Sequence, residues 1–221
     1  MNKLLVSDIL NLNSGSYNLD FNTQEAIINI KEDVTIYILN NKSLNKLTIN
    51  LEENSILKLY KFDKVIDNNV NVIINQNNNS KLYYNATFIN KENVVLKIDN
   101  YIKGNNNESN INIRNISNNN LSKIKINVDV TKNTINNIAL EDIKGINNGG
   151  YIQIEPNIIC ETNEVVANHL TTIGTTDKYL IQYLMSKGIN KENAKKIILK
   201  GFILSNMDNN FIDLIGGEFD V

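Results

Sequence analysis

The sequence predicts a mostly β fold followed by a small helical region. Three observations lead to this prediction. Apolar and polar residues alternate from about residue 26 to 130, polar clusters interrupt the alternation about every ten residues, and after about Thr175 the apolar residues recur at helical spacing. We therefore expect a β-rich body over residues 1–174 and a helical region over residues 175–221.

The alternating stretches predict short strands that bury one face. They are Ala26/Ile28/Ile30, Val34/Ile36/Ile38, Leu47/Ile49/Leu51, Val70/Val72/Ile74, Leu82/Tyr84/Ala86/Phe88 and Ile124/Ile126/Val128/Val130. Polar clusters rich in Asn separate them and predict turns. Strands of this length and spacing are typical of a sandwich, a barrel or a β-solenoid.

The turn residues favour the solenoid. Sandwich hairpins commonly use Asn-Gly turns, but the chain has one such pair, Asn148-Gly149, and Gly is scarce before Gly145. Solenoid turns accept Asn, which enters the left-handed region readily. The chain contains 45 Asn and 35 Ile but a single Arg, Arg114. This bias is typical of an AT-rich genome, so we assign no function to the abundance of Asn.

The region after Thr175 predicts two helices and a third helical turn. The first is expected near Asp177 to Lys187, capped by Thr175 or Thr176 and ended by Gly188. Its apolar stripe is Tyr179, Leu180, Tyr183 and Leu184, which we expect to pack on the β-body. The second is expected after the cap Asn190, with a stripe of Ala194, Ile197, Ile198 and Phe202. The third piece spans residues 209–215.

Composition excludes several classes of function. A net charge of −2 argues against a strongly electrostatic nucleic-acid or membrane-surface binder. A single Cys cannot form an internal disulfide, and no zinc-ligand spacing or Ser–His–Asp arrangement can be assembled around the one His and one Cys. Gly149-Gly150 lacks the Gly-Lys-Ser/Thr of a phosphate loop, so the chain is not expected to be an ATPase. The unpaired cysteine and the lack of a signal-like start predict a cytoplasmic protein, or one inside an organelle with an AT-rich genome.

Single residues have plain structural interpretations when taken alone. A lone His169 is most simply a hydrogen-bonded structural residue, and Cys160 is expected to pack as a small buried hydrophobe. We expect Glu155, Glu161 and Glu164 to belong to a solvated turn, because nothing in the pattern places them on one face.

The C-terminal third resembles the core of the SufB/SufD family, subunits of the SUF iron–sulfur cluster assembly machinery. The segments that carry the resemblance are PNIICETNEVVANHLTTIG, YLIQYLMSKGI and NKENAKKIILKGF. The matching positions are Pro156, Glu164, Val165, His169, Thr172, Gly174, Tyr183, Leu184, Ser186, Gly188, Ile189, Ala194, Gly201 and Phe202.

The resemblance implies a right-handed parallel β-helix and a non-catalytic scaffold. It implies that His169 is a candidate ligand at the interface where a nascent iron–sulfur cluster forms transiently, with no tightly bound cofactor. The implied partners are a SufB-like subunit and a SufC-like ATPase, with the ATPase bound by the C-terminal helices. The partner-binding candidates are Tyr183, Leu184, Lys187, Gly188, Gly201 and Phe202, with Lys195 as a further exposed position.

Departures from the family pattern define a short SufD-like member. We expect the family's usual helical N-terminal region to be absent. Leu170 stands where SufB-type chains have Glu, Ala167 stands where SufD-type chains often have Cys, and Lys187 replaces the usual Arg. We therefore expect a partner to supply the thiolates of any cluster.

Two other functions stay open from the sequence. The chain can be a homodimeric scaffold that works with the ATPase alone, although the missing site cysteine disfavours this. It can also be a β-helix that binds carbohydrate or mediates adhesion. The single Arg and the lack of a signal peptide count against that class.

Overall fold

The computed structural model describes residues 2–40, 43–64, 69–90 and 92–216, which form fifteen strands and three helices. The strands are β1 (Asn2–Val6), β2 (Ile9–Leu12), β3 (Gly15–Phe21), β4 (Glu25–Ile30), β5 (Asp33–Leu39), β6 (Lys46–Leu51), β7 (Ile56–Asp63), β8 (Val70–Gln76), β9 (Lys81–Asn90), β10 (Val94–Ile102), β11 (Glu108–Ser117), β12 (Leu121–Val130), β13 (Asn137–Asn147), β14 (Tyr151–Cys160) and β15 (Val165–Gly174).

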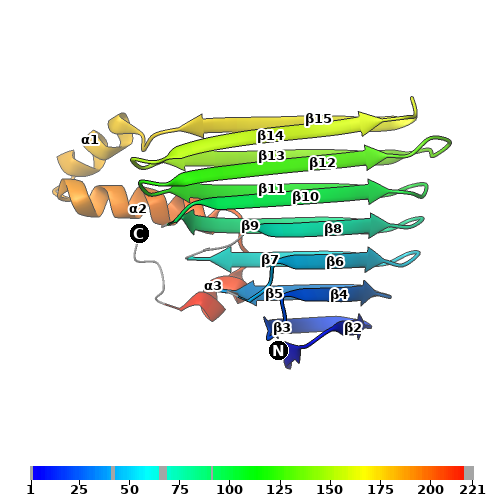
Figure 1. Cartoon of the computed structure of the whole chain (residues 1–221). Coiled ribbons are helices and arrows are strands. Elements are labelled where there is room, and N and C mark those ends of the chain that lie inside the picture. Colours follow the sequence, from blue (N-terminus) through cyan, green and yellow to red (C-terminus); the bar gives the residue numbers. More distant parts are fainter. Residues whose placement is uncertain (1, 41–42, 65–68, 91, 217–221) are drawn as a thin grey trace.

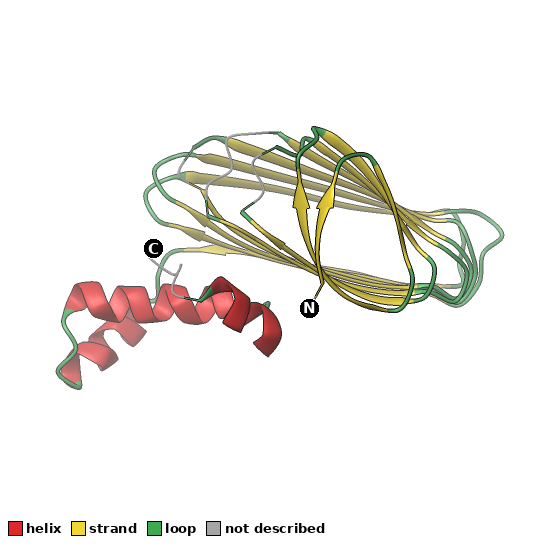
Figure 2. Ribbon diagram, turned by 90° about the horizontal axis from the view of Figure 1, so that it is seen from below, coloured by secondary structure: helices red, strands yellow, loops and turns green. Residues whose placement is uncertain are grey.

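The strands form two parallel sheets that face each other. Odd-numbered strands form an eight-stranded sheet in chain order, and even-numbered strands form a seven-stranded sheet in the same order. The chain thus adds one strand to each sheet per turn, which gives stacked coils with both termini of the β-body at opposite ends of the stack (Figure 1). Figure 2 looks along this stack and shows the two sheets enclosing a flattened core. The predicted β-solenoid is confirmed, and the sandwich and barrel are excluded.

The coils widen steadily along the chain. Leu4 pairs with Leu19, fifteen residues later, whereas Leu57 pairs with Leu82 and Ser109 with Ala139, intervals of 25 and 30 residues. The strands lengthen in step, from 5 residues in β1 to 11 in β13. Since each strand residue adds about 3.3 Å, the last coils are much wider than the first.

The predicted alternation places the core as expected. All apolar residues of the alternating stretches point into one continuous core that runs through the solenoid, and they are buried. Strands β1, β2 and β3 extend this core toward the N-terminus, a region in which the sequence analysis assigned no strands. The inner side chains stack in register from coil to coil, so each coil covers the inner face of the next.

Asparagine forms the predicted left-handed turns and, in addition, side-chain ladders that the sequence analysis did not predict. Asn54, Asn79, Asn106 and Asn136 occupy the same turn in four successive coils, and all have positive φ. Their side chains hydrogen-bond in a ladder, with Nδ2–Oδ1 distances of 3.0, 3.0 and 3.2 Å. The prediction that solenoid turns use left-handed Asn is confirmed, and the abundance of Asn is more than a codon effect.

Three helices follow the last strand: α1 (Lys178–Ser186), α2 (Lys191–Leu204) and α3 (Asn209–Ile215). The predicted caps Asn190 and Gly188 are confirmed, since Asn190 Oδ1 accepts from Asn193 N and Gly188 has φ +87°. The first cap is Asp177 rather than Thr175 or Thr176. Its carboxylate accepts from the free N–H groups of Tyr179 and Leu180, which a shorter hydroxyl earlier in the chain does not reach.

The helices lie outside the solenoid against the odd-numbered sheet (Figure 2). A second core forms there, where α2 and α3 pack on the outer faces of the middle strands. Its buried members are Tyr37, Phe62, Ile89, Ile116, Leu199, Ile203, Phe211 and Ile215. Within the described residues no helix is long and apolar enough to cross a membrane.

Two predicted helical stripes are corrected. The stripe of α1 does not pack on the β-body, because no residue of α1 is buried. In α2 the buried residues are Ala194, Leu199 and Ile203, whereas Ile197 is 49% exposed. The stripe is therefore rotated from the predicted one, because α2 packs on the second core through its C-terminal half.

Candidate functional site

The last coil of the solenoid is open. Strands β14 and β15 end their sheets, so within the described chain each has a paired neighbour on one side only. No residue of β15 is buried, whereas each of the strands β4 to β13 has several buried residues. Pro156 lies in β14, and an edge strand tolerates its missing N–H. This end therefore presents free backbone groups and an uncovered inner face together.

His169 lies in the inner row of this open coil. It pairs in register with Glu141 of β13, whose neighbours Ala139 and Ile143 are buried in the core. Because in-register residues of parallel strands project to the same face, His169 belongs to the inner row of the last coil, next to the position that a further coil would occupy. The imidazole is exposed, and it is the single histidine of the chain.

Glu141 lies directly beneath His169 in the column of inner residues. It is 3% exposed, and neither carboxyl oxygen has a hydrogen-bond partner. The next residues in the same column, Ile111 and Tyr84, are fully buried. Burial in these surroundings raises the pKa of Glu141 to about 7. The sequence analysis missed Glu141, because its position inside the core depends on the register of β13.

Cys160 is exposed, contrary to the expected buried packing role. It continues the inner row of β14 in register with buried Val130, but no later coil covers it. Partial burial of the sulfur and the nearby Asp129 carboxylate raise the pKa of the Cys160 thiol. The free thiol is therefore less readily ionised than that of an ordinary cysteine.

The acidic residues near this end do not gather into one site. Glu155 lies within the β14 strand rather than in a turn, and it pairs with Lys123 at 2.9 Å. Glu161 Oε2 accepts from Lys132 N at 3.4 Å, and Glu164 is exposed in the turn before β15. Across the described residues, no three His, Cys, Asp or Glu side chains are grouped to hold a metal ion.

The α1–α2 hairpin forms a second surface, separate from the open coil. Tyr179 is 84% exposed and Tyr183 58% exposed, and Leu184 is half-buried. Lys187 Nζ lies 5.5 Å from the centre of the Tyr183 ring, a cation–π contact. Exposed aromatic residues on an unburied helix are typical of a protein-binding surface.

The remaining predicted partner-binding residues have different environments. Gly188 ends α1 in the left-handed region, which is a structural role. Gly201 is exposed on α2, and a Cβ built there would meet no atom within 4 Å. Phe202 is half-buried against the second core, so part of its ring supports the fold.

A hollow of about 640 Å³ lies between the hairpin and the turn that joins β13 to β14. Ile181 and Met185 form its apolar part, and lysines stand around it. The lining lysines are Lys178, Lys191 and Lys195. This hollow therefore combines an apolar part with positive charge.

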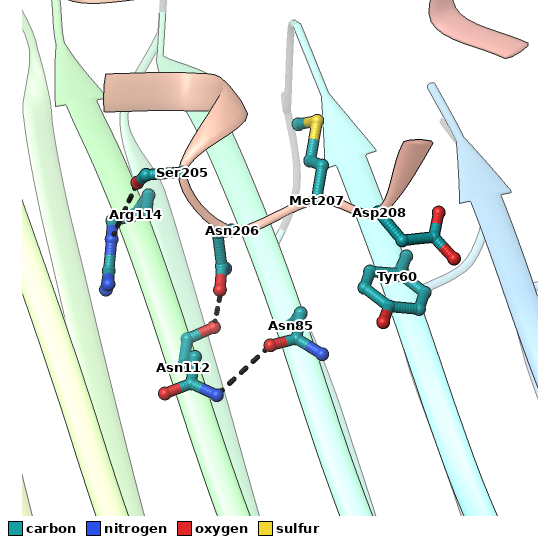
Figure 3. A pocket seen from close by; sticks show the side chains of 8 residues that line it. All are labelled: Tyr60, Asn85, Asn112, Arg114, Ser205, Asn206, Met207 and Asp208. Carbon is teal, nitrogen blue, oxygen red and sulfur yellow. Dashed lines mark hydrogen bonds between the residues drawn. The ribbon is translucent and has the colours of Figure 1, made fainter. Parts of the chain in front are cut away.

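A polar pocket of about 340 Å³ lies where the turn from α2 to α3 meets the outer face of the sheet (Figure 3). Its groups are engaged in anchoring the helices. Arg114 donates to Asp142 Oδ2 at 2.8 Å and to Ser205 Oγ at 3.4 Å, and Asn206 donates to the carbonyls of Asn112 and Ala86. We therefore interpret this pocket as a structural joint.

Comparisons with known proteins match the C-terminal part of the chain. Residues 146–202 match the family model described as SUF system FeS cluster assembly, SufBD core domain. A 48-residue segment is 35% identical to the iron-sulfur cluster assembly protein SufD of Bacillus subtilis (strain 168). That segment covers 22% of this chain and 11% of the length of that relative. These matches show that the C-terminal part of this chain is similar to the core of SufB/SufD proteins.

Proposed function

We propose that this chain is a non-catalytic scaffold subunit of a SUF-type iron–sulfur cluster assembly complex. The observation that carries the proposal is the position of the matched segment. Residues 146–202 contain the open coil, in which no residue of β15 is buried, and helix α1, which has no buried residue. A scaffold that joins other subunits needs such surfaces.

The open coil supports pairing with a SufB-like subunit. Free strand edges pair readily with strands of another chain, and the exposed apolar residues add buried area when they are covered. Val166, Leu170 and Ile173 are each about half exposed or more. In this arrangement His169 lies at the subunit interface, where iron and sulfide are the cargo and the partner supplies the thiolates.

The hairpin supports binding of a SufC-like ATPase. Six of its residues between 178 and 200 are Lys, against the single acidic Glu192. The basic charge, the exposed tyrosines and the apolar hollow together fit an acidic docking surface with an apolar side chain at its centre. ATP-driven movement of the ATPase would then act through α1 and α2 on the coil next to them. The cytoplasmic location remains part of this proposal.

Co-purification tests the proposal. The chain is expressed with the SufC-like ATPase and with any SufB-like protein of the same genome, and the complexes are separated by size exclusion. Tyr179→Asp with Tyr183→Asp is expected to abolish binding of the ATPase and to leave pairing with the SufB-like chain. Ala167→Lys with Ile173→Lys is expected to give the reverse pattern, because both positions lie in the uncovered inner row of the open coil.

Leu5→Lys is the matched control, since Leu5 is an exposed apolar residue at the other end of the solenoid. It is expected to leave both interactions intact. A folded chain that elutes as a monomer in the presence of both candidates contradicts the proposal. Self-association through the open coil, without a SufB-like chain, would instead favour the homodimeric scaffold.

A further inference from the structure

The turn from β13 to β14 contains Asn148-Gly149, the one Asn-Gly pair of the chain. Such pairs are prone to deamidation, because glycine has no Cβ and leaves its backbone nitrogen open to the side-chain amide of the residue before it. In a folded protein the reaction also requires that this nitrogen is accessible and free of a hydrogen bond.

Gly149 meets both requirements. It is exposed, and its N–H donates no hydrogen bond to any residue that the structure describes. Its φ of +93° lies in the region that residues with a side chain rarely adopt. The turn around it is anchored, since Asn148 N donates to the Ser117 carbonyl at 2.9 Å and Tyr151 N donates to the Asn120 carbonyl at 2.9 Å. The Gly149 nitrogen is therefore a free group within a fixed turn.

The Asn148 amide is held by one hydrogen bond. Its Nδ2 donates to Asn118 Oδ1 in the preceding coil. This bond must break before the amide nitrogen can leave. The fold therefore slows deamidation relative to an unfolded chain, and Asn118 controls how much.

We propose that Asn148 is a site of spontaneous deamidation that changes the charge of the hollow beside the α1–α2 hairpin. The Gly149 nitrogen attacks Cγ of Asn148, so that a new C–N bond forms and the Cγ–Nδ2 bond breaks. Nδ2 leaves as ammonia, which carries away the proton of the Gly149 nitrogen. Water then opens the cyclic succinimide at either carbonyl and leaves aspartate or isoaspartate at position 148.

The product places a negative charge at the hollow. Its carboxyl group is ionised at neutral pH. Asn148 and Gly149 line the hollow together with Lys178, Lys191 and Lys195, so the new charge offsets part of the positive charge there. The consequence for binding rests on the proposed function, in which an acidic surface of the ATPase docks at this hairpin. Docking then weakens as the chain ages.

Ageing of the purified full chain tests the modification without any partner. The folded protein is incubated at mildly alkaline pH, and its peptides are analysed by mass spectrometry. We expect the mass increase of an amide-to-acid conversion at Asn148. We expect none at Asn79, because the N–H of the following Ser80 is buried and donates to Asn107 Oδ1. Asn118→Ala is expected to accelerate the reaction, because it removes the bond to Asn148 Nδ2.

Two controls make the result decisive. Asn148→Gln should stay unmodified at position 148, because glutamine would have to form a larger ring. The wild-type chain denatured in urea gives the rate without the fold. If Asn148 stays unmodified in the folded chain while the denatured chain reacts to completion, the inference is overturned.

Asn148→Asp carries the charge of the product and tests the consequence for binding. Its affinity for the SufC-like ATPase is expected to fall by about two- to fivefold, and by less at high salt. Asn163→Asp is the matched control, since it adds the same charge in the turn from β14 to β15, outside the hollow. Equal affinity of Asn148→Asp and the wild type overturns the effect on docking. A wild-type chain that never binds the ATPase overturns the proposed function, whereas the mass measurement still decides whether Asn148 is modified.

Discussion

The two ends of the solenoid are built differently, although both end a pair of sheets. At the narrow N-terminal end, Val6 and Leu12 are buried in the first coil. At the wide C-terminal end, β15 has no buried residue, and Ile173 is 47% exposed. A terminal coil of this protein can thus cover its own inner face when it is narrow. The open end is therefore a specific feature, and it coincides with the segment that matches the SufBD core.

The largest expected effect on stability comes from replacing Ile by Ala in a covered coil, compared with the same replacement in the open coil. Ile113 is fully buried in β11, so Ile113→Ala should lower the free energy of unfolding by about 3 kcal/mol. Ile173→Ala in β15 should lower it by less than about 1 kcal/mol, since little apolar area is lost. Urea denaturation measures both. Equal losses would show that the open coil is packed in solution and would remove the contrast between the ends.

The pH dependence of stability sharpens the comparison at Glu141. Burial raises the pKa of Glu141 to about 7, above the value of 4.5 expected in the unfolded chain. The folded state therefore holds its proton longer, so this contribution to stability is full at low pH and is lost as pH rises toward 7. The loss is about 3 kcal/mol. Urea unfolding of the wild type and Glu141→Gln between pH 5 and pH 8 should show the loss in the wild type alone.

The opposite slope, or the same slope in both proteins, would place the Glu141 carboxylate in water. In that case the last covered coil would be open as well. Metal-free conditions are required for this measurement, because a bound cation would stabilise the ionised carboxylate.

The asparagine ladder distinguishes the stacked coils from the last one. Asn106 has φ 56°, and its side chain bonds to those of Asn79 and Asn136. Asn106→Ala should cost about 2 kcal/mol, because it adds left-handed strain to the lost bonds. Asn106→Gly should cost about 1 kcal/mol, since glycine accepts this conformation. Thermal unfolding compares the two, and equal costs would mean that the side-chain ladder, not the backbone, sets the effect.

A small effect is expected where α3 joins the outer face of the sheet. Tyr37 Oη donates to Asp208 Oδ2 at 2.8 Å, and the Asp208 carboxylate also caps α3. Tyr37→Phe removes one hydrogen bond and should cost about 1 kcal/mol. For a chain of this size the expected decrease in Tm is about 2–4 °C. Hydrogen exchange should rise in α3 and remain unchanged in α1, which packs on no part of the solenoid core.

Local pattern was sufficient for most of the β-body. Inner residues such as Ile28, Ile49 and Ile74 are buried as predicted. Strict alternation puts all apolar residues of a strand on one face, so that face must be the one turned to the core. The caps Asn190 and Gly188 were also predictable, since a helix end is satisfied by residues close in sequence. The first three strands were missed, because their alternation is short and interrupted by polar residues.

The sequence analysis was wrong or silent at three kinds of position, where burial depends on contacts between residues far apart in the chain. Cys160 has the pattern of a buried strand residue, yet it lies on the last coil and is exposed. The stripe of α1 has the spacing of a packed helix, but α2 and α3 occupy the sheet face instead. Glu141 is charged and stands beside Asp142, so the sequence suggests an exposed position. The pairing of β13 with its neighbouring strands nevertheless places Glu141 in the core. Each outcome depends on neighbours many residues away.

The sequence by itself determined the alternation of strands, the Asn-rich turns, the helix ends and the resemblance of the C-terminal part to the SufB/SufD family. These depend on interactions within one coil or one helical turn, where side-chain type decides the free energy. The tertiary structure alone decided that the coils widen, that the last coil stays open, and that Glu141 lies beneath His169. Stacking in register creates these features, because a strand's burial depends on the coils above and below it rather than on its own residues.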